Sequence, residues 1–222
     1  MNHHSPKHRT DAAAFIEANM RIGAVPTLAD VQLYTAHPGS GLWRLADEQG
    51  DDAPPPYWAY QWAGGLALAR HFFEHPDLVR GRCLLDLGSG SGLVAIAALK
   101  VGASSAIAAE IDPNAVAAIG LNAALNGVRL AVLADDVLDG PPPDVDLVAV
   151  GDLFYASDLA GRVTGFLDRC LAAGIEVLVG DPGRPSLPLS RLRPVAAYDV
   201  PDVGMAGGGG RGAVYAFGAK QP

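Results

Sequence analysis

The sequence has few basic residues, few cysteines and no long apolar run. Its 16 lysines and arginines are outnumbered by 24 aspartates and glutamates, so the formal charge is −8. A protein that binds nucleic acid regardless of sequence needs a basic face, so no nucleic-acid partner is expected. An acidic surface suits a basic partner such as a lysine-bearing protein, although solubility explains it more simply. The N-terminus lacks the apolar core of a signal peptide, and no apolar run reaches membrane-spanning length. We therefore expect a cytoplasmic protein with no membrane partner.

The two cysteines, Cys83 and Cys170, lie inside apolar segments and are not spaced as metal ligands. Buried, reduced thiols are the simpler interpretation and fit a cytosolic protein. His3, His4 and His8 could hold a metal loosely, but a disordered polar tail explains them better. No metal site is expected.

The chain of 222 residues is long enough for one α/β domain with a small addition. Residues 1–56 are predicted to form an N-terminal appendage and residues 57–222 the main domain. In the appendage, Thr10 could cap a short helix that ends near Met20. An extended piece follows over 27–36, and the segment 50–56, rich in aspartate and proline, separates the two parts.

In the main domain, short apolar runs alternate with stretches of helical periodicity. Apolar strands separated by helices predict a parallel sheet that is covered on both faces. The predicted strands are 82–87, 105–110, 129–134, 145–151 and 175–180, and the predicted helices are 62–76, 92–101, 113–126 and 157–173.

The end of the chain breaks this alternation. Two further strand patterns, 193–200 and 212–219, are joined by a glycine-rich stretch with no room for a crossover helix. Parallel neighbours need such a crossover, so the pair is predicted to be an antiparallel hairpin.

A glycine-rich turn, Gly88-Ser89-Gly90-Ser91-Gly92, follows the first of these strands. Such a turn lets a ligand approach the backbone. The dinucleotide fingerprint wants a third glycine where this chain has Leu93, and the turn lacks the lysine of a P-loop. A nucleoside ligand is favoured over a pyrophosphate.

Asp86 directly precedes this turn. Its carboxylate would repel a pyrophosphate but attract a cation, and S-adenosylmethionine carries both a sulfonium and an ammonium. Asp86 could instead cap the turn, and the two roles are compatible.

Acidic residues also follow the next two strands. Glu110 comes 20 positions after Gly90, the offset at which an acid accepts the ribose hydroxyls. Asp112, the neighbouring alternative, is better placed to cap the following helix before its proline. After the third strand, Asp136 or Asp135 could accept a hydrogen bond from the adenine amino group, or both could lie in a solvated loop.

The fourth strand ends in 151-GDLFY-155. Asp152 is suitably placed to orient an amine next to a methyl donor. Enzymes that methylate amide or base nitrogens have prolines in this loop, and their absence here disfavours those substrates. Phe154 and Tyr155 could line an acceptor channel or could pack beneath the sheet edge.

The fifth strand ends in 180-GDPGRP-185, a loop stiffened by two prolines. Asp181 and Arg184 could form an ion pair there and make the rim on which a substrate docks. A rigid turn without chemistry is the alternative.

From residue 57 onward the sequence resembles the seven-strand class I methyltransferases, and within them the electron transfer flavoprotein β-subunit lysine methyltransferases. The matching stretches are 57-YWAYQWAGGLALAR-70, 80-RGRCLLDLGSGSG-92, 110-EIDP-113, 151-GDLFY-155 and 180-GDPGRP-185. Their combination covers roughly three quarters of the chain.

The resemblance implies a Rossmann-like α/β sheet of order 3-2-1-4-5-7-6 with an antiparallel last strand. It also implies that Trp62, Gly64 and Gly65 border the cofactor and that Asp152 faces the acceptor lysine. The appendage is similar to the less regular leader of that family, although Ala29-Asp30 stands where the family often has Pro-Glu.

The resulting hypothesis is transfer of a methyl group from S-adenosylmethionine to a lysine ε-amine, with the electron transfer flavoprotein β-subunit as the expected partner. Trp58, Phe154 and Tyr155 would desolvate the amine and lower its pKa, and a partly exposed Asp152 would orient it. A ribosomal-protein lysine or a small-molecule amine could be the acceptor instead. The protein could also be a non-catalytic regulatory binder of the cofactor, or a nicotinamide-dependent oxidoreductase.

Overall fold

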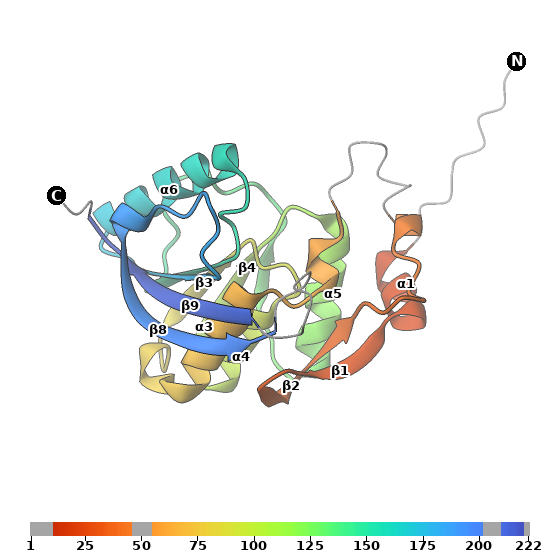
Figure 1. The fold of residues 1–222 in the computed structure, drawn as a ribbon. Helices are drawn as coiled ribbons and strands as arrows, with labels where there is room; N and C mark the ends of the chain where they lie inside the picture. The colour runs from red at the N-terminus through yellow and green to blue at the C-terminus, as the bar shows by residue number, and fades with distance from the viewer. Residues whose placement is uncertain (1–10, 46–54, 202–209, 220–222) are drawn as a thin grey trace, which may run out of the picture.

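A seven-stranded sheet forms the centre of the computed structural model, which describes residues 11–45, 55–201 and 210–219 (Figure 1). The strand order is β5-β4-β3-β6-β7-β9-β8. All neighbours from β5 to β7 are parallel, and β9 is antiparallel to both β7 and β8. The strands are β3 (Cys83–Leu87), β4 (Ser105–Ala109), β5 (Ala131–Leu133), β6 (Leu147–Gly151), β7 (Glu176–Asp181), β8 (Leu192–Val200) and β9 (Gly210–Phe217).

This topology confirms the predicted order and the terminal antiparallel hairpin. Counted from β3, the order is 3-2-1-4-5-7-6. The hairpin strands begin and end within two residues of their predicted bounds. Strand β5 is shorter than predicted, with three residues at the edge of the sheet.

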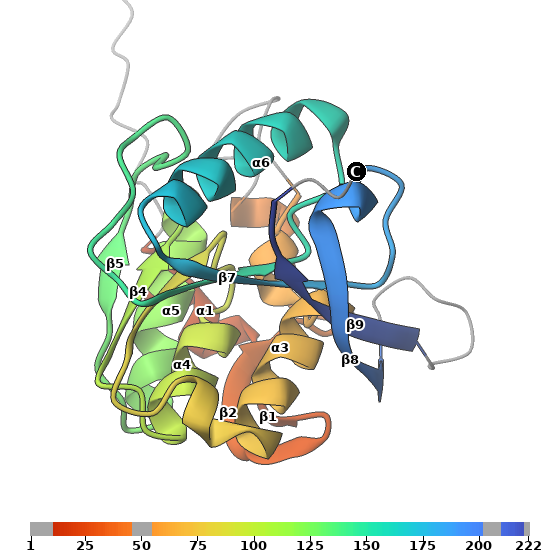
Figure 2. The ribbon, with the colours of Figure 1, turned by 90° about the vertical axis from the view of Figure 1, so that its left-hand side faces the viewer.

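Four helices cover the two faces of the sheet (Figure 2). One face is covered by α3 (Ala63–Glu74), α4 (Leu93–Lys100) and α5 (Pro113–Leu125), and the other by α6 (Ser157–Ala172). Two large apolar clusters fill these layers, which explains why the central strands β3 and β6 are apolar on both faces.

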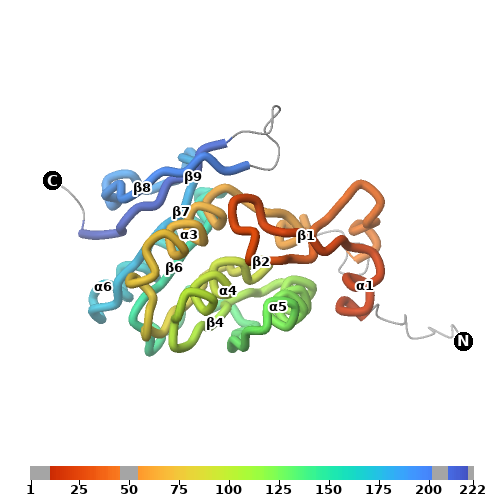
Figure 3. The backbone as a smooth tube through the Cα atoms, turned by 90° about the horizontal axis from the view of Figure 1, so that it is seen from below, coloured from red at the N-terminus to blue at the C-terminus, as the bar shows by residue number. Residues whose placement is uncertain are grey.

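The N-terminal part packs beside α5 (Figure 3). It contains α1 (Ala12–Asn19) and an antiparallel hairpin of β1 (Arg21–Val25) and β2 (Leu28–Thr35). Thr10 lies outside the described residues, and the side chain of Asp11 caps α1 by accepting from Ala13 N at 3.0 Å. The predicted division at residue 56 stays a prediction.

Two asparagines, one within α5 and one at its C-terminal end, attach the hairpin to this helix. Tyr34 N donates to Asn122 Oδ1 at 2.9 Å, and Gln32 N donates to Asn126 Oδ1 at 3.0 Å. Asn122 also donates to Ser91 O at 2.8 Å, directly beside the glycine turn. The hairpin is therefore part of the support for that turn.

Cys170 is buried and Cys83 only partly so, and both thiols are free. His3, His4 and His8 lie outside the described residues. Within the parts of the chain that the structure describes, no three His, Cys, Asp or Glu side chains are grouped as metal ligands. None of the described helices has the length and apolar character needed to cross a membrane.

Candidate active site

A cleft of about 450 Å³ opens at the carboxyl ends of β3, β4 and β6, where ligands bind in open α/β sheets. Its volume lies within the range of about 300–1,000 Å³ that is usual for small-molecule sites. Within the described part of the chain, the charged residues that line it are Glu110, Asp112, Asp135, Asp136, Asp152, Arg162 and Arg184. Five acids against two arginines give the cleft a negative lining, which favours a cationic ligand.

The glycine turn forms one wall of the cleft. Gly88, Gly90 and Gly92 have φ values of 65°, 56° and 83°, in the left-handed region that favours glycine. Gly88 and Gly90 line the cleft, whereas Gly92 is the N-cap of α4 and the side chain of Ser89 is buried. Because a side chain would strain this backbone, glycine is favoured at these positions. At Gly88 and Gly90 the bare main chain therefore faces the cleft.

Asp86 lies beneath the turn and does not line the cleft. Its carboxylate accepts from Ser89 Oγ at 2.6 Å and from Ala95 N at 3.1 Å. Burial raises the pKa of Asp86 to about 6, although these two hydrogen bonds oppose the shift. The capping role is confirmed, and direct contact with a cationic ligand stays a prediction.

Glu110 lines the cleft beside the turn, at the predicted offset from Gly90. Its Oε2 accepts from Gly90 N at 2.8 Å, while its Oε1 accepts from the backbone N–H groups of Ile111 and Asp112. One lone pair of Oε2 is left for a ligand hydroxyl. Asp112 caps α5 by accepting from Asn114 N at 2.8 Å, as predicted.

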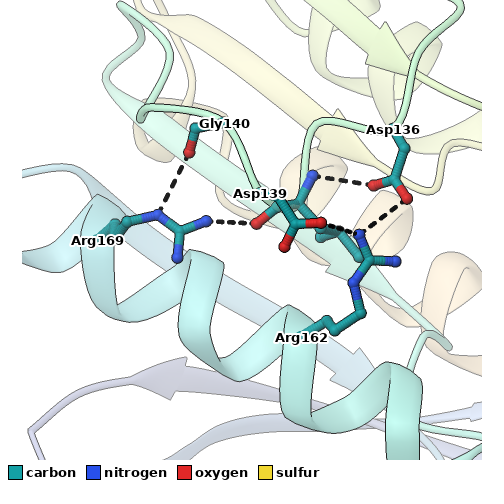
Figure 4. A network of polar contacts seen from close by, with 6 residues as sticks. Asp136, Asp139, Gly140, Arg162 and Arg169 are labelled. Atoms are coloured by element: carbon teal, nitrogen blue, oxygen red, sulfur yellow. Dashed lines mark hydrogen bonds and ion pairs between the residues drawn. The ribbon is translucent and has the colours of Figure 1, made fainter.

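Asp135 and Asp136 both line the far end of the cleft. Asp136 belongs to the ion-pair network of Figure 4, in which Arg162 Nη2 contacts Asp136 at 2.9 Å and Asp139 at 2.6 Å. Burial of Asp136 would raise its pKa, but the Leu138 N–H and Arg162 outweigh it and lower that pKa overall. Asp136 is therefore ion-paired with Arg162. Arg162 also lines the cleft, and the sequence did not single it out.

The loop between β5 and β6 is fixed to α6 by a second arginine of the same network. Arg169 donates from Nη2 to Leu138 O and from Nε to Gly140 O at 3.3 Å. The far end of the cleft is therefore attached to the helix that follows the loop of Asp152.

Asp152 stands at the end of β6 with φ 58°, a left-handed conformation that is uncommon outside glycine. Its Oδ2 accepts from Gly65 N at 2.8 Å, and its Oδ1 contacts Arg184 Nη2 at 2.6 Å. The side chain is 10% exposed and lines the cleft. Burial raises the pKa of Asp152 to about 6, and Arg184 is the strongest opposing influence. Such strain and such a pKa are typical of functional residues.

Gly64 and Gly65 support Asp152 from the start of α3, behind the cleft surface. A Cβ on Gly64 would lie 2.2 Å from Gly180 O and 2.6 Å from Asp152 Oδ2. Because these glycines have no side chain, α3 can approach β6 and β7 closely. This close approach also brings the Gly65 N–H within hydrogen-bond distance of the Asp152 carboxylate. Neither glycine is among the lining residues.

The predicted Asp181–Arg184 pair exists, with Nε and Oδ2 3.8 Å apart, but Arg184 contacts Asp152 more closely. The guanidinium also lies 5.8 Å from the centre of the Trp62 ring. Asp181 is fully buried, and its Oδ1 accepts from the backbone N–H groups of Gly183 and Arg184. It shapes the loop and does not line the cleft, so its predicted position on the substrate rim is corrected.

The aromatic residues of the loops divide into two groups. Phe154 is fully buried in the core beneath α6, so the packing alternative holds for it and its predicted place in the channel wall is wrong. Tyr155, Trp58 and Trp62 line the cleft, and their predicted roles stay predictions. Tyr57 also lines the cleft, although the sequence did not single it out. Its place within the 57-YWAYQW-62 motif is the signal that could have found it.

A relative from Rattus norvegicus, named electron transfer flavoprotein β-subunit lysine methyltransferase, is 39% identical over 198 residues. The match covers 85% of this chain and 76% of the relative. The chain belongs to this methyltransferase family. The human member is 42% identical over 177 residues, which cover 78% of this chain and 66% of that protein. The chain thus spans about two thirds to three quarters of these two relatives.

The chain also resembles a further family and a solved structure that are described as methyltransferases. The sequence model of the ribosomal protein L11 methyltransferases matches residues 73–151. The crystal structure of a protein from Pyrococcus horikoshii, described as a candidate RNA methyltransferase, matches 76% of this chain and 90% of its own. The TM-score is 0.53 at 17% identity, which shows a shared fold alone.

Proposed function

We propose that this methyltransferase moves methyl groups from S-adenosylmethionine to lysine ε-amines of a protein, the electron transfer flavoprotein β-subunit. The observation that carries the proposal is the Asp152–Arg184 pair in a negatively lined cleft, which tyrosine and tryptophan side chains also line. The names of the relatives supply the substrate.

The residues of the cleft fit the cofactor. S-adenosylmethionine, when bound, supplies a methyl group on a positively charged sulfur. The acidic lining suits that charge, and the free lone pair of Glu110 Oε2 suits a ribose hydroxyl. Trp58 Nε1 is buried without a hydrogen-bond partner among the described residues, so it is a donor that a ligand could satisfy. Asp135 is better placed than Asp136 to accept from an adenine, because Asp136 is paired with Arg162.

The acceptor lysine must lose its proton, because its ordinary pKa is about 10.4 and only the neutral amine is nucleophilic. Tyr57, Trp62 and Tyr155 would surround its side chain and replace water, which lowers that pKa. Asp152 would accept a hydrogen bond from the amine and orient it. Arg184 already pairs with Asp152, so the carboxylate would hold the ammonium form less strongly than an unpaired carboxylate would.

Methylation of a ribosomal protein is the second candidate, and the match to the ribosomal protein L11 family over residues 73–151 supports it. That match ends just before Asp152 and includes neither the acceptor loop nor Arg184. The relatives that match 85% and 78% of this chain therefore favour the flavoprotein. A non-catalytic binder has no use for the strained, paired Asp152, and the missing third glycine disfavours a nicotinamide enzyme. Free thiols at Cys83 and Cys170 are compatible with action in the cytoplasm.

The test compares the wild type with Asp152→Ala in two measurements, and uses Asp144→Asn as a control because Asp144 is exposed and outside the cleft. Isothermal titration measures cofactor binding, and labelled S-adenosylmethionine in cell extract reports methyl transfer to proteins. We expect Asp152→Ala to bind the cofactor and to lose nearly all transfer, about 100-fold or more. Full activity of Asp152→Ala would remove Asp152 from the mechanism. Label that appears only in small molecules would exclude a protein substrate.

A further inference from the structure

Tryptophan and tyrosine side chains are concentrated on one part of this protein. The chain has three tryptophans and six tyrosines. Trp58, Trp62, Tyr57 and Tyr155 line the cleft, and Trp43 and Tyr60 line a second hollow of about 390 Å³. These two residue types dominate the binding energy of protein interfaces, so their concentration around two hollows indicates a contact surface.

Four of these rings form a continuous strip that connects the cleft with the second hollow. The ring centres of Tyr155 and Tyr57 are 5.6 Å apart, those of Tyr57 and Trp62 5.8 Å, and those of Trp62 and Tyr60 6.5 Å. We call Tyr155, Tyr57, Trp62 and Tyr60 the aromatic strip. It begins at the proposed position of the acceptor lysine and ends on the wall of the second hollow.

The second hollow is formed by a loop that hydrogen bonds hold in place. Buried Ser40 accepts through Oγ from His37 N at 2.9 Å, and Ala36 N donates to Ala59 O at 3.0 Å, beside the aromatic strip. Leu42 is buried, but the adjacent Trp43 is 66% exposed. A large indole is thus presented to solvent from a fixed backbone.

The lining of the second hollow indicates which chemistry it would accept. Among the described residues that line it, His37 and Tyr60 are the titratable ones, and proline, leucine, glycine and alanine supply much of the remainder. The cleft at the other end of the strip is lined by five acids and two arginines. The surface therefore suits a chain with a basic side chain at one point and an apolar side chain at another.

We propose that the aromatic strip and the second hollow are the docking surface for the polypeptide of the protein substrate. The acceptor lysine enters the cleft beside Asp152, the substrate chain crosses Tyr60, and an apolar side chain of the substrate packs against Trp43. This inference rests on the proposed function. It adds that the enzyme recognises a segment of chain next to the lysine and not the lysine alone.

The test measures methylation of purified electron transfer flavoprotein by the enzyme at saturating S-adenosylmethionine. Trp43→Ala removes the exposed ring, Trp43→Phe keeps an aromatic ring, and Leu189→Ala is the matched control. Leu189 is 68% exposed and lines neither hollow. We expect Trp43→Ala to raise the KM for the flavoprotein about tenfold, with kcat and cofactor affinity within twofold of the wild type.

Recovery of most of the lost affinity in Trp43→Phe, and no change in Leu189→Ala, would support docking at the hollow. Equal KM values for Trp43→Ala and the wild type would overturn the docking surface while leaving the proposed function intact. A wild-type enzyme that binds the cofactor but methylates no lysine of the flavoprotein would overturn the proposed substrate, and the docking surface with it.

Discussion

Replacing Arg184 with glutamine should slow methyl transfer and move its pH dependence upward. Arg184 Nη2 lies 2.6 Å from Asp152 Oδ1, and the two side chains are only 20% and 10% exposed. Two unit charges about 4 Å apart interact by about 4 kcal/mol near a protein surface. Halving this value for solvent screening leaves about 2 kcal/mol, which corresponds to about 1.5 pKa units.

Both consequences of the Arg184→Gln change act in the same direction. Without the guanidinium, the pKa of Asp152 rises further above about 6, because burial and the nearby Asp181 both favour its neutral form. Where Asp152 is ionised, its unbalanced charge holds the lysine ammonium and raises the pKa of that amine as well. The reactive combination of a carboxylate and a neutral amine then requires a higher pH.

The assay is kcat of flavoprotein methylation as a function of pH. We expect the rising limb of the profile to move up by about 1.5 pH units in Arg184→Gln, with a roughly tenfold or greater loss at neutral pH. Arg191→Gln is the control, because Arg191 pairs with Asp168 away from the cleft. An unchanged profile and an unchanged kcat in Arg184→Gln would refute the charge-balancing role.

Two further predictions concern the scaffold of the site. Gly64→Ala should lower the free energy of unfolding by about 3 kcal/mol, because its Cβ would lie 2.2 Å from Gly180 O. The control is Gly120→Ala on α5, where an added Cβ would meet no atom within 4 Å, and its free energy of unfolding should rise by about 0.5–1 kcal/mol. Equal free energies of unfolding for the two variants, measured by urea denaturation, would contradict the packing argument. For Asp86, burial raises the folded-state pKa from 3.8 to about 6, so its contribution to stability is full below about pH 4 and is lost as the pH rises through about 6. Relative to Asp86→Asn, the wild type should lose about 3 kcal/mol over that interval, and a difference in unfolding free energy that does not change with pH would show that the pKa is not raised.

Much of the architecture could be predicted because alternating apolar strands and helices determine a parallel sheet, and a short glycine-rich connection requires a hairpin. Strand β1 could not be predicted. Its turn into β2 has proline, Pro26, at the second position, which is common in such turns, but the third position is Thr27 at φ 67°, a conformation that favours glycine or asparagine. The turn signal is therefore only half present in the sequence. A run such as Arg21–Val25 becomes a strand through its pairing with β2.

The acids of the site could be located because they directly follow strands that share one edge of the sheet. Glu110 and Asp152 both line the cleft for that reason. Contacts between distant residues could not be predicted. Arg184 reaches Asp152 from 32 positions away. Phe154 is buried in the core, while its neighbour Tyr155 lines the cleft. The path of the loop backbone decides which of the two is buried, and the sequence does not give that path.

The most direct test of the proposed function is mass spectrometry of purified electron transfer flavoprotein after incubation with the enzyme and S-adenosylmethionine. We predict that methyl groups are added to lysines of the β-subunit alone. We also predict that replacing the modified lysines with arginine, once peptide analysis has located them, abolishes the addition. An enzyme that binds the cofactor but leaves every flavoprotein lysine unmodified would contradict the proposed function.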